Sequence, residues 1–277
     1  VWLHPEHYYL DARGEPIVVA GVPPDYFSET GQLWGNPLYR WDRMADEDYA
    51  WWSARLKRAL NQADVFRIDH FRGFAGYYEI PASCPTAEDG VWVPGPGKAL
   101  FESIERTLGH LPIVAEDLGL ITEDVIELRD GFEFPGMKIL QFGFGSDASD
   151  DFLPHNWARN FVAYTGTHDN DTVRGWWLGA TERERAYAGS YLATDQAHVH
   201  WAMIRACCNS VANIAVFPLQ DVLGLDGAHR MNVPGTVGPH NWTWRFDWQW
   251  LGSEPARVLG LISAASGRGP LELLKLP

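Results

Sequence analysis

The amino-acid sequence predicts an α/β fold: the C-terminal part of a TIM (β/α)8 barrel, with about five β/α units and long active-site loop insertions. Short apolar segments that look buried on both faces alternate with helical segments, as in a parallel sheet covered by helices. Three of these segments lead to a carboxylate, namely Asp69, Glu116 and Asp169. Barrel enzymes take catalytic groups from several strand ends on one face, so these acids are candidate catalytic residues.

The first third of the chain predicts a long loop, one helix and one strand. Residues 1–43 are rich in Pro, Gly and aromatics without helical periodicity, and structured loops of this length tend to be functional. Residues 46–62 predict a helix, because acidic residues open it and basic residues lie toward its C-terminal end. Residues 65–68 follow as a strand. The Pro- and Gly-rich residues 81–97 are interpreted as an active-site loop.

The rest of the chain continues the alternation. The expected elements are helices over 98–108 and 123–129, strands over 111–115, 137–144, 160–164 and 214–219, and mostly helical structure over 182–213. Gly109 ends the first of these helices and Thr122 could cap the second. A complete barrel needs eight units. We therefore expect the missing amino-terminal strands before Val1, and residues 1–277 to be one partial catalytic domain with no second domain boundary.

Composition excludes several classes of function. Hydrophobic residues make up 46% of the 277 residues and charged residues 21%, as in a folded globular protein. The net charge of −14 opposes binding to nucleic acid or anionic membranes. Three cysteines without CxxC spacing support neither a disulfide framework nor a zinc site and favour a cytoplasmic location. The chain begins at Val1 rather than Met, which leaves an upstream targeting segment open.

We expect neither a metal nor a cofactor. The GFG sequence at residues 143–145 lacks the third glycine of a dinucleotide-binding loop, and no phosphate-binding GxxxxGK[ST] motif occurs. The single histidine among the carboxylates of residues 168–171 has no diagnostic metal-ligand spacing.

The paired acids fit the chemistry of glycosidic bonds, which needs an acid for the leaving oxygen and a carboxylate on the other side of the sugar. Arg67 precedes Asp69 by two residues, so both point to the same side of a strand and the guanidinium favours the ionised carboxylate. Apolar residues precede Glu116, so burial there raises its pKa. Each acid also has a structural interpretation: an ion pair that anchors a loop, a turn cap at Glu116, or a hydrogen-bonded turn over residues 168–171.

Longer motifs carry a family resemblance. VFRIDHFRGF, IVAEDLG and YTGTHDND, in this order, resemble the strand motifs of the α-amylase superfamily of retaining glycosidases. PPDYFSETGQLWGNPLYRW over residues 23–41, and RMNVPGT followed by NWTWR over residues 230–245, resemble the amylomaltases or disproportionating enzymes. These are the 4-α-glucanotransferases of glycoside hydrolase family 77. The resemblance runs from about residue 1 to about residue 250.

The resemblance implies roles for individual residues. Asp69 would be the nucleophile that forms a covalent glucosyl-enzyme, Glu116 the acid and then the base, and Asp169 the stabiliser of the transition state. The implied substrate-binding residues are Arg67, His168, Tyr26, Trp34 and Asn36. Among them Arg67 would bond the nucleophile and His168 the sugar at the cleavage subsite. The aromatic pair would stack on the acceptor sugar, with the asparagine as a polar contact.

The implied function is transfer of α-1,4-glucan segments between maltooligosaccharides by a retaining double displacement. The expected partners are α-1,4-glucans and maltooligosaccharides, and the oligomeric state is left open. Two alternatives stay open. An α-glucan hydrolase of the same superfamily would share the three acids, and an inactive or sugar-binding fragment would bind glucan without turnover, with unpaired sheet edges that invite aggregation.

Overall fold

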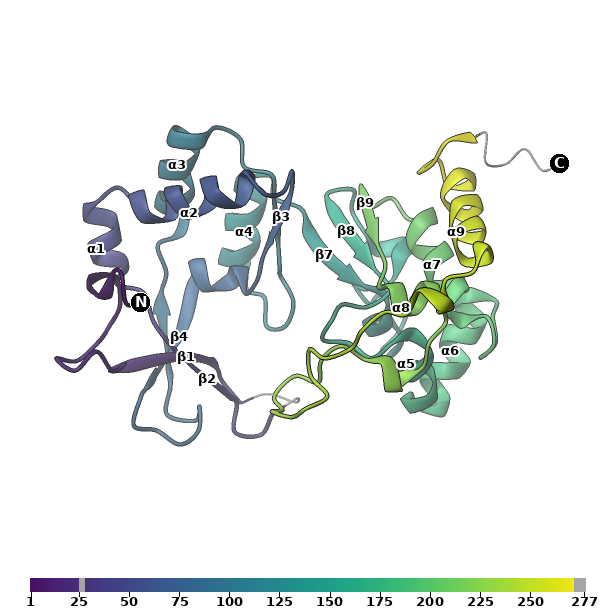
Figure 1. The fold of residues 1–277 in the computed structure, drawn as a ribbon, viewed down its shortest axis with the longest axis horizontal. Helices are drawn as coiled ribbons and strands as arrows, with labels where there is room; N and C mark the ends of the chain where they lie inside the picture. The colour runs from purple at the N-terminus through teal and green to yellow at the C-terminus, as the bar shows by residue number, and fades with distance from the viewer. Residues whose placement is uncertain (25–27, 272–277) are drawn as a thin grey trace. The chain divides into compact units, whose positions relative to one another are not determined.

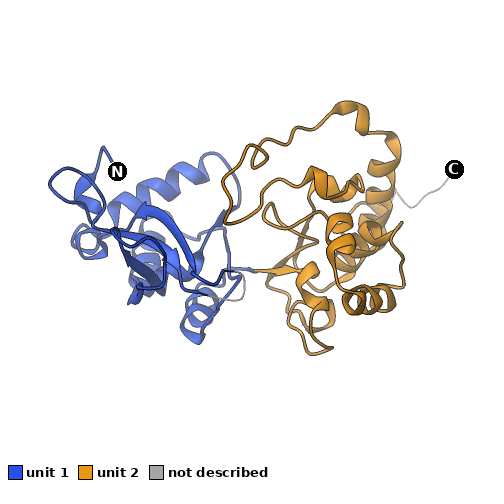
Figure 2. Cartoon of the chain, turned by 90° about the horizontal axis from the view of Figure 1, so that it is seen from below, with its two compact units in different colours: residues 1–136 blue, residues 137–277 orange. Residues whose placement is uncertain are grey.

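The computed structural model describes residues 1–24 and 28–271, and the chain divides into two compact units, residues 1–136 and 137–277 (Figures 1 and 2). Both units combine helices with strands, as the predicted α/β class requires. Within the described ranges, no helix is long and apolar enough to cross a membrane.

A four-stranded antiparallel sheet in the first unit contradicts the loop expected over residues 1–43. Its strand order is β2-β1-β4-β5. The strands are β1 (Val18–Val22), β2 (Gln32–Pro37), β4 (Gly76–Pro81) and β5 (Val91–Pro94). The register of β1 against β2 shifts between Val19 and Gly21, where an added Cβ would lie 2.2 Å from the carbonyl oxygen of Gln32. The prediction was wrong because β1 pairs with β4, which lies far along the chain, and β5 lies inside the expected insertion.

Two short parallel strands in the same unit confirm the predicted strands that precede Asp69 and Glu116. β3 (Phe66–Ile68) pairs with β6 (Ile113–Ala115), and Ile68 faces Ala115 in the register. Parallel strands end at the same edge, about 4.8 Å apart. The residues that follow them therefore leave the sheet side by side.

Helices and aromatic side chains build the core of the first unit. The helices are α1 (Trp41–Asp46), α2 (Ala50–Leu60), α3 (Gly97–Leu108) and α4 (Glu123–Gly131). The single helix predicted over residues 46–62 is broken, because Asp48 and Tyr49 have left-handed backbones with φ of 47° and 54°. α3 ends at Gly109, with φ of 77°, as predicted. Phe71 and Phe101 lie at the centre of the core, and both are fully buried.

The second unit is built on a three-stranded sheet in the order β7-β8-β9. Its strands are β7 (Gly136–Ile139), β8 (Phe161–Tyr164) and β9 (Ile214–Val216), and β8 pairs with β9 in parallel. The strand expected over residues 137–144 is shorter, because a 3-10 helix, η3 (Leu140–Phe144), takes over. Leu140 and Phe144 of η3 are both buried in the core of this unit.

The second unit also contains α-helices, named here in chain order. They are α5 (Val173–Gly179), α6 (Glu182–Leu192), α7 (Val199–Asn209), α8 (Leu219–Val222) and α9 (Ser253–Ala265). The helical segment predicted over residues 182–213 divides at Ala193, whose φ is 50°. α6 begins with a capping box between Thr181 and Glu184. The other 3-10 helices are η1 (Pro5–His7), η2 (Phe71–Phe74), η4 (Pro154–Asn156), η5 (Gly227–His229) and η6 (Trp248–Trp250).

Candidate functional site

Asp69 follows β3 and forms the predicted ion pair with Arg67. A guanidinium nitrogen of Arg67 lies 2.8 Å from Oδ1 of Asp69. The Asp69 side chain is 76% exposed, so the pair holds the carboxylate without closing it off from solvent. This arrangement orients an accessible anion at the end of a strand.

Glu116 follows β6, and its carboxylate accepts two backbone hydrogen bonds. The N–H of His70 donates to Oε2 over 2.7 Å, and the N–H of Leu118 donates to Oε1 over 2.9 Å. Burial raises the pKa of Glu116 above its ordinary value, and the Asp69 charge adds to the rise. The backbone donors and Arg67 act in the opposite direction. The net effect is a carboxyl group that keeps its proton to a higher pH than a solvated glutamate, as a general acid must.

The backbone between the two acids is held in an unusual conformation. His70 has a φ of 50°, a left-handed value that is uncommon for a residue with a side chain. Its N–H donates to Glu116 while the next residue, Phe71, enters the core and donates its own N–H to the Glu116 carbonyl oxygen over 3.2 Å. Desolvation lowers the pKa of the His70 imidazole to about 4, so this ring is neutral at pH 7. His70 therefore connects the two acids, because it follows Asp69 in the chain and its N–H donates to the Glu116 carboxylate.

The segment after Glu116 is anchored by a buried ion pair. Asp117 pairs with Arg129 of α4, and both side chains are largely buried. The two neighbouring acids therefore differ: Asp117 forms an ion pair, whereas the Glu116 carboxylate accepts hydrogen bonds from backbone N–H groups. The turn-cap interpretation of Glu116 is also accurate in part, since its carboxylate does accept from Leu118.

Trp34 lies against the turn that carries Asp69. Its ring meets that of His70 edge-on, with 4.8 Å between centroids, and its side chain is partly exposed. Asn36 lies two residues further along β2 and is exposed. Tyr26, the third residue expected from this motif, lies outside the described residues.

In the second unit, His168 and Asp169 lie on the loop that follows β8. Nε2 of His168 lies 3.3 Å from Oδ2 of Asp169. The side-chain amide of Asn232 donates to Oδ1 of Asp169 over 2.7 Å, and Arg230 donates to the Asp169 backbone carbonyl over 2.6 Å. The ring of Trp242 lies 5.1 Å from that of His168. Asp169 is therefore held by a segment far away in the sequence.

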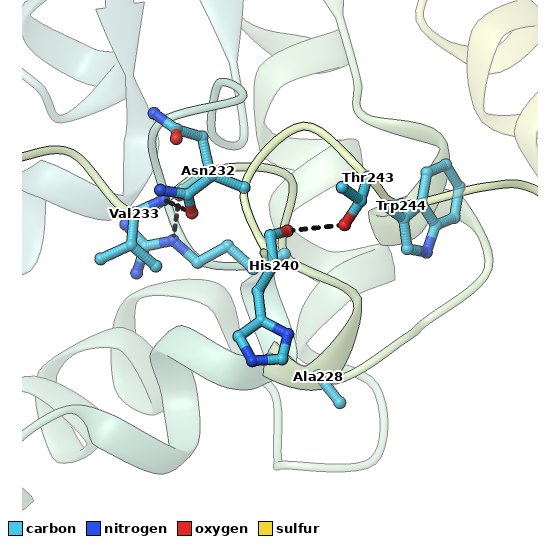
Figure 3. Close-up of a pocket in the computed structure, with 9 residues that line it drawn as sticks. Ala228, Asn232, Val233, His240, Thr243 and Trp244 are labelled. Atoms are coloured by element: carbon cyan, nitrogen blue, oxygen red, sulfur yellow. Dashed lines mark hydrogen bonds between the residues drawn. The ribbon is translucent and has the colours of Figure 1, made fainter. Parts of the chain in front are cut away.

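That same segment lines a cavity of about 410 Å³ (Figure 3). The lining residues are Gly227, Ala228, Arg230, Asn232, Val233, His240, Asn241, Thr243 and Trp244. The Thr243 hydroxyl donates to the carbonyl oxygen of His240 over 3.1 Å, and Asn241 accepts from the Val233 N–H over 3.0 Å (Figure 3). These bonds organise the loop that presents Arg230 and Asn232 to Asp169.

Asp221 closes the base of the loop that carries His168 and Asp169. The Thr165 hydroxyl donates to one of its oxygens over 2.6 Å, and the Val173 N–H donates to the other over 2.7 Å. Thr165 and Val173 are the two ends of the loop, so one carboxylate holds both. Asp221 is only 1% exposed, and this burial raises its pKa to about 6. Asp171 raises the pKa of Asp221 further, whereas the two hydrogen bonds lower it.

The site residues that were not predicted from the sequence include Arg230, Asn232 and Asp221. The RMNVPGT motif contains the first two, so the signal was present without an assignment. Asp221 comes shortly after the strand predicted over residues 214–219. The predicted residues fall into two sets: Arg67, Asp69, Glu116 and Trp34 meet in the first unit, and His168 meets Asp169 in the second.

Outside these two sets, three side chains of types that can bind a metal lie close together within the described ranges. His4, Glu6 and His7 bring one ligand atom each to within 4.8 Å of one another. None of these residues belongs to either set.

A family model described as 4-alpha-glucanotransferase matches residues 1–249. The chain is 53% identical to the 4-alpha-glucanotransferase of Thermus thermophilus over 253 residues, which are 88% of this chain and 50% of that protein. It is 50% identical to the chloroplastic/amyloplastic 4-alpha-glucanotransferase of Solanum tuberosum over 246 residues, covering 88% of this chain and 42% of that one. The chain thus spans about half the length of these relatives.

Solved structures of amylomaltases have a similar fold. The amylomaltase from Streptococcus agalactiae in complex with acarbose superposes with a TM-score of 0.94 at 40% identity. The match covers 97% of this chain and 55% of that one. The amylomaltase from Corynebacterium glutamicum, at 20% identity and a TM-score of 0.74, shares the fold over 91% of this chain.

Proposed function

The chain belongs to the 4-alpha-glucanotransferase family, and from this premise we propose that it is part of an enzyme that transfers α-1,4-glucan segments between maltooligosaccharides. The observation that carries the proposal is the pairing of Asp69 and Glu116 at one edge of the β3–β6 pair, with an accessible anion beside a carboxyl of raised pKa. A retaining glycosidase needs both groups, an ionised carboxylate as the nucleophile and a protonated carboxyl group as the acid.

In the proposed first step, Glu116 donates its proton to the glycosidic oxygen and Asp69 attacks the anomeric carbon. The C–O bond to the leaving glucan breaks, and a covalent glucosyl ester of Asp69 forms. In the second step Glu116, now ionised, takes the proton from the 4-hydroxyl of an acceptor sugar. That oxygen displaces Asp69, so the product regains the α configuration.

Other residues bind and orient the sugar in this proposal. Arg67 holds the nucleophile, and its ion pair with Asp69 supports that role. Asp169 stabilises the transition state through secondary hydroxyls, and His168 bonds the same sugar. Trp34, Tyr26 and Asn36 contact the acceptor. The contact of Trp34 with His70 supports a place for this tryptophan beside the nucleophile.

We also propose that residues 1–277 are part of one catalytic TIM-barrel domain, whose other β/α units belong to the half that the relatives have in addition. The parallel pairs β3–β6 and β8–β9, each leading to a candidate acid, support this view. The acarbose bound to the Streptococcus agalactiae amylomaltase supports a sugar ligand for this fold. No cofactor, nucleic acid or membrane enters the proposed reaction, and we propose a cytoplasmic location.

Thin-layer chromatography of products from maltotriose tests the proposal. The 277-residue chain is assayed beside a chimera that adds, before Val1, the half of the Thermus thermophilus relative that lies outside the match. Glucose together with a ladder of longer oligosaccharides is expected. Glucose and maltose alone would indicate the hydrolase alternative, and glucan binding without products from either form would indicate the inactive or sugar-binding alternative.

A further inference from the structure

The turn at residues 4–7 brings two imidazoles and a carboxylate together. One ligand atom from each of His4, Glu6 and His7 lies within 4.8 Å of the others, and Nδ1 of His4 is 3.1 Å from Oε1 of Glu6. In a tetrahedral zinc site with bonds of about 2.0–2.2 Å, neighbouring ligand atoms are roughly 3.3–3.6 Å apart. The spacing of one pair is therefore within a few tenths of an ångström of this range, and rotation of the exposed side chains can adjust the others.

His7 supplies the second, independent observation. Its side chain is 3% exposed, and its Nε2 lies 3.2 Å from Oε2 of Glu47, the residue that follows α1. Its Nδ1 is buried without a hydrogen-bond partner among the residues that the structure describes. Buried polar atoms without a partner are rare. A neutral ring that donates from Nε2 to the carboxylate leaves a lone pair on Nδ1, available for a ligand.

A histidine whose far nitrogen donates to a carboxylate is the usual arrangement of a metal-ligating histidine. We propose that His4, Glu6 and His7 form a binding site for a divalent first-row transition-metal ion, Zn²⁺ in the first place, with Glu47 orienting the ring of His7. Two imidazoles and one carboxylate favour zinc over Mg²⁺ or Ca²⁺, which prefer oxygen ligands throughout. Solvent takes the fourth position.

Binding requires one local change. The rings of His4 and His7 are stacked, with centroids 5.3 Å apart and planes at 12°. Two nearly parallel rings cannot both direct an in-plane lone pair at one ion. His4 is about half exposed, so its ring turns toward the ion while the buried ring stays in place.

The site would fasten the start of the described chain to α1. The N–H of Arg40, which precedes α1, donates to the carbonyl oxygen of His7 over 2.8 Å, and Glu47 contacts the ring of His7 from the other end of that helix. The ion would add a cross-link between His4 and this framework. None of its ligands takes part in the proposed glucan chemistry, so the site stands independently of that function.

Isothermal titration of the 277-residue chain with ZnCl₂ tests the site. One ion per chain is expected. His4→Ala and Glu6→Gln change exposed residues and leave the core intact, and each should weaken binding at least about tenfold. Glu47→Gln should weaken it by roughly 10–100-fold, because it removes the carboxylate that orients the ring.

Two control variants exclude other sites. His198 lies 2.9 Å from Asp195, an exposed pair that offers two ligands rather than three, so His198→Ala should bind like the unmodified chain. Cys84→Ser tests the partly exposed thiol in the same way. X-ray absorption of the zinc-loaded chain should show nitrogen and oxygen ligands at about 2.0–2.2 Å and no sulfur. Absence of saturable binding, unchanged binding in both His4→Ala and Glu6→Gln, or equal competition by Mg²⁺ would each overturn the proposal.

Discussion

The side-chain amide of Asn232 donates a hydrogen bond to Oδ1 of Asp169 over 2.7 Å, across 63 residues of sequence. The other carboxylate oxygen of Asp169 lies 3.3 Å from His168, so both oxygens have a defined neighbour. Arg230 fixes the backbone of the same residue. Asp169 is therefore presented by two separate segments rather than by its own loop alone.

Removal of the Asn232 amide should lower the rate of glucan transfer. A hydrogen bond to a charged group contributes about 1.5–3 kcal/mol, so Asn232→Ala should reduce kcat on maltotriose by roughly 10–100-fold. Asn156→Ala is the matched control, because its amide donates to two backbone carbonyls elsewhere in the second unit. Equal rates in the two variants would contradict a role for this bond in presenting Asp169. The measurement is kcat on maltotriose, in whichever of the two forms, the 277-residue chain or the chimera, transfers glucan.

Glu116→Gln should separate the two proposed steps. Loss of a general acid costs about 10²–10⁴ in rate on maltotriose. A maltosyl fluoride needs no proton on its leaving group, so it should still react with Asp69. Azide should then rescue turnover and yield the α-azide, because two displacements restore the configuration. A β-azide would contradict the covalent intermediate, and Glu102→Gln on α3 serves as the control.

Arg67→Ala should impair activity far more than stability. Its ion pair with Asp69 is largely solvated, and such pairs contribute at most about 1 kcal/mol to folding. Arg106→Ala is a matched control, since Arg106 forms an ion pair of the same 2.8 Å length with Asp48. Thermal melts of the two variants should agree, whereas only Arg67→Ala should lose transfer activity. A similar loss in both would assign Arg67 a structural role.

Trp34→Ala should shift the reaction from transfer toward hydrolysis. Without the stacking surface the acceptor sugar is held less well, so water reaches the covalent intermediate more often. The expected result is a higher yield of reducing ends per maltotriose consumed, with an unchanged melting temperature because the ring is partly exposed. Trp2→Ala, at a residue that is almost fully exposed, should leave the ratio unchanged. An unaltered ratio in Trp34→Ala would argue against acceptor contact.

Asp221 should make the chain less stable as the pH rises from about 4 to about 6. Its pKa is about 6 in the folded state against 3.8 for the ordinary group, so the folded state binds more protons in this window. The folded state loses up to about 3 kcal/mol of relative stability over the window, an order-of-magnitude figure. Urea unfolding at pH 4.5 and 7.5 should show this difference, and Asp221→Asn should reduce it. The same pH dependence in both proteins would show that Asp221 does not cause it.

The sequence predicted the strands that precede the candidate acids, because these segments are short and mostly apolar. Short apolar segments before Asp69, Glu116 and Asp169 favour strands, and parallel pairing then fixes where the next residue leaves the sheet. Local chemistry also predicted the end of α3 at Gly109. These features depend on neighbours in the sequence.

Features that depend on distant partners were not predictable in the same way. The strands β1 and β2 carry Gly, Pro and polar residues that resemble a loop, and β1 also pairs with the distant strand β4. The break between α1 and α2 at Tyr49 has no Gly or Pro to mark it. Two hydrogen bonds, from Asn232 to Asp169 and from Thr165 to Asp221, join segments more than fifty residues apart. No local pattern encodes such a choice of partner.

The turn around His70 connects the proposed acid/base residue Glu116 to the aromatic core. Asp69 is largely solvated, whereas Phe71, two residues later, is fully buried and stacks on Phe101. A core substitution that moves Phe71 will also move the N–H that Glu116 accepts. Laboratory evolution for heat tolerance that repacks this aromatic cluster should therefore alter turnover as well.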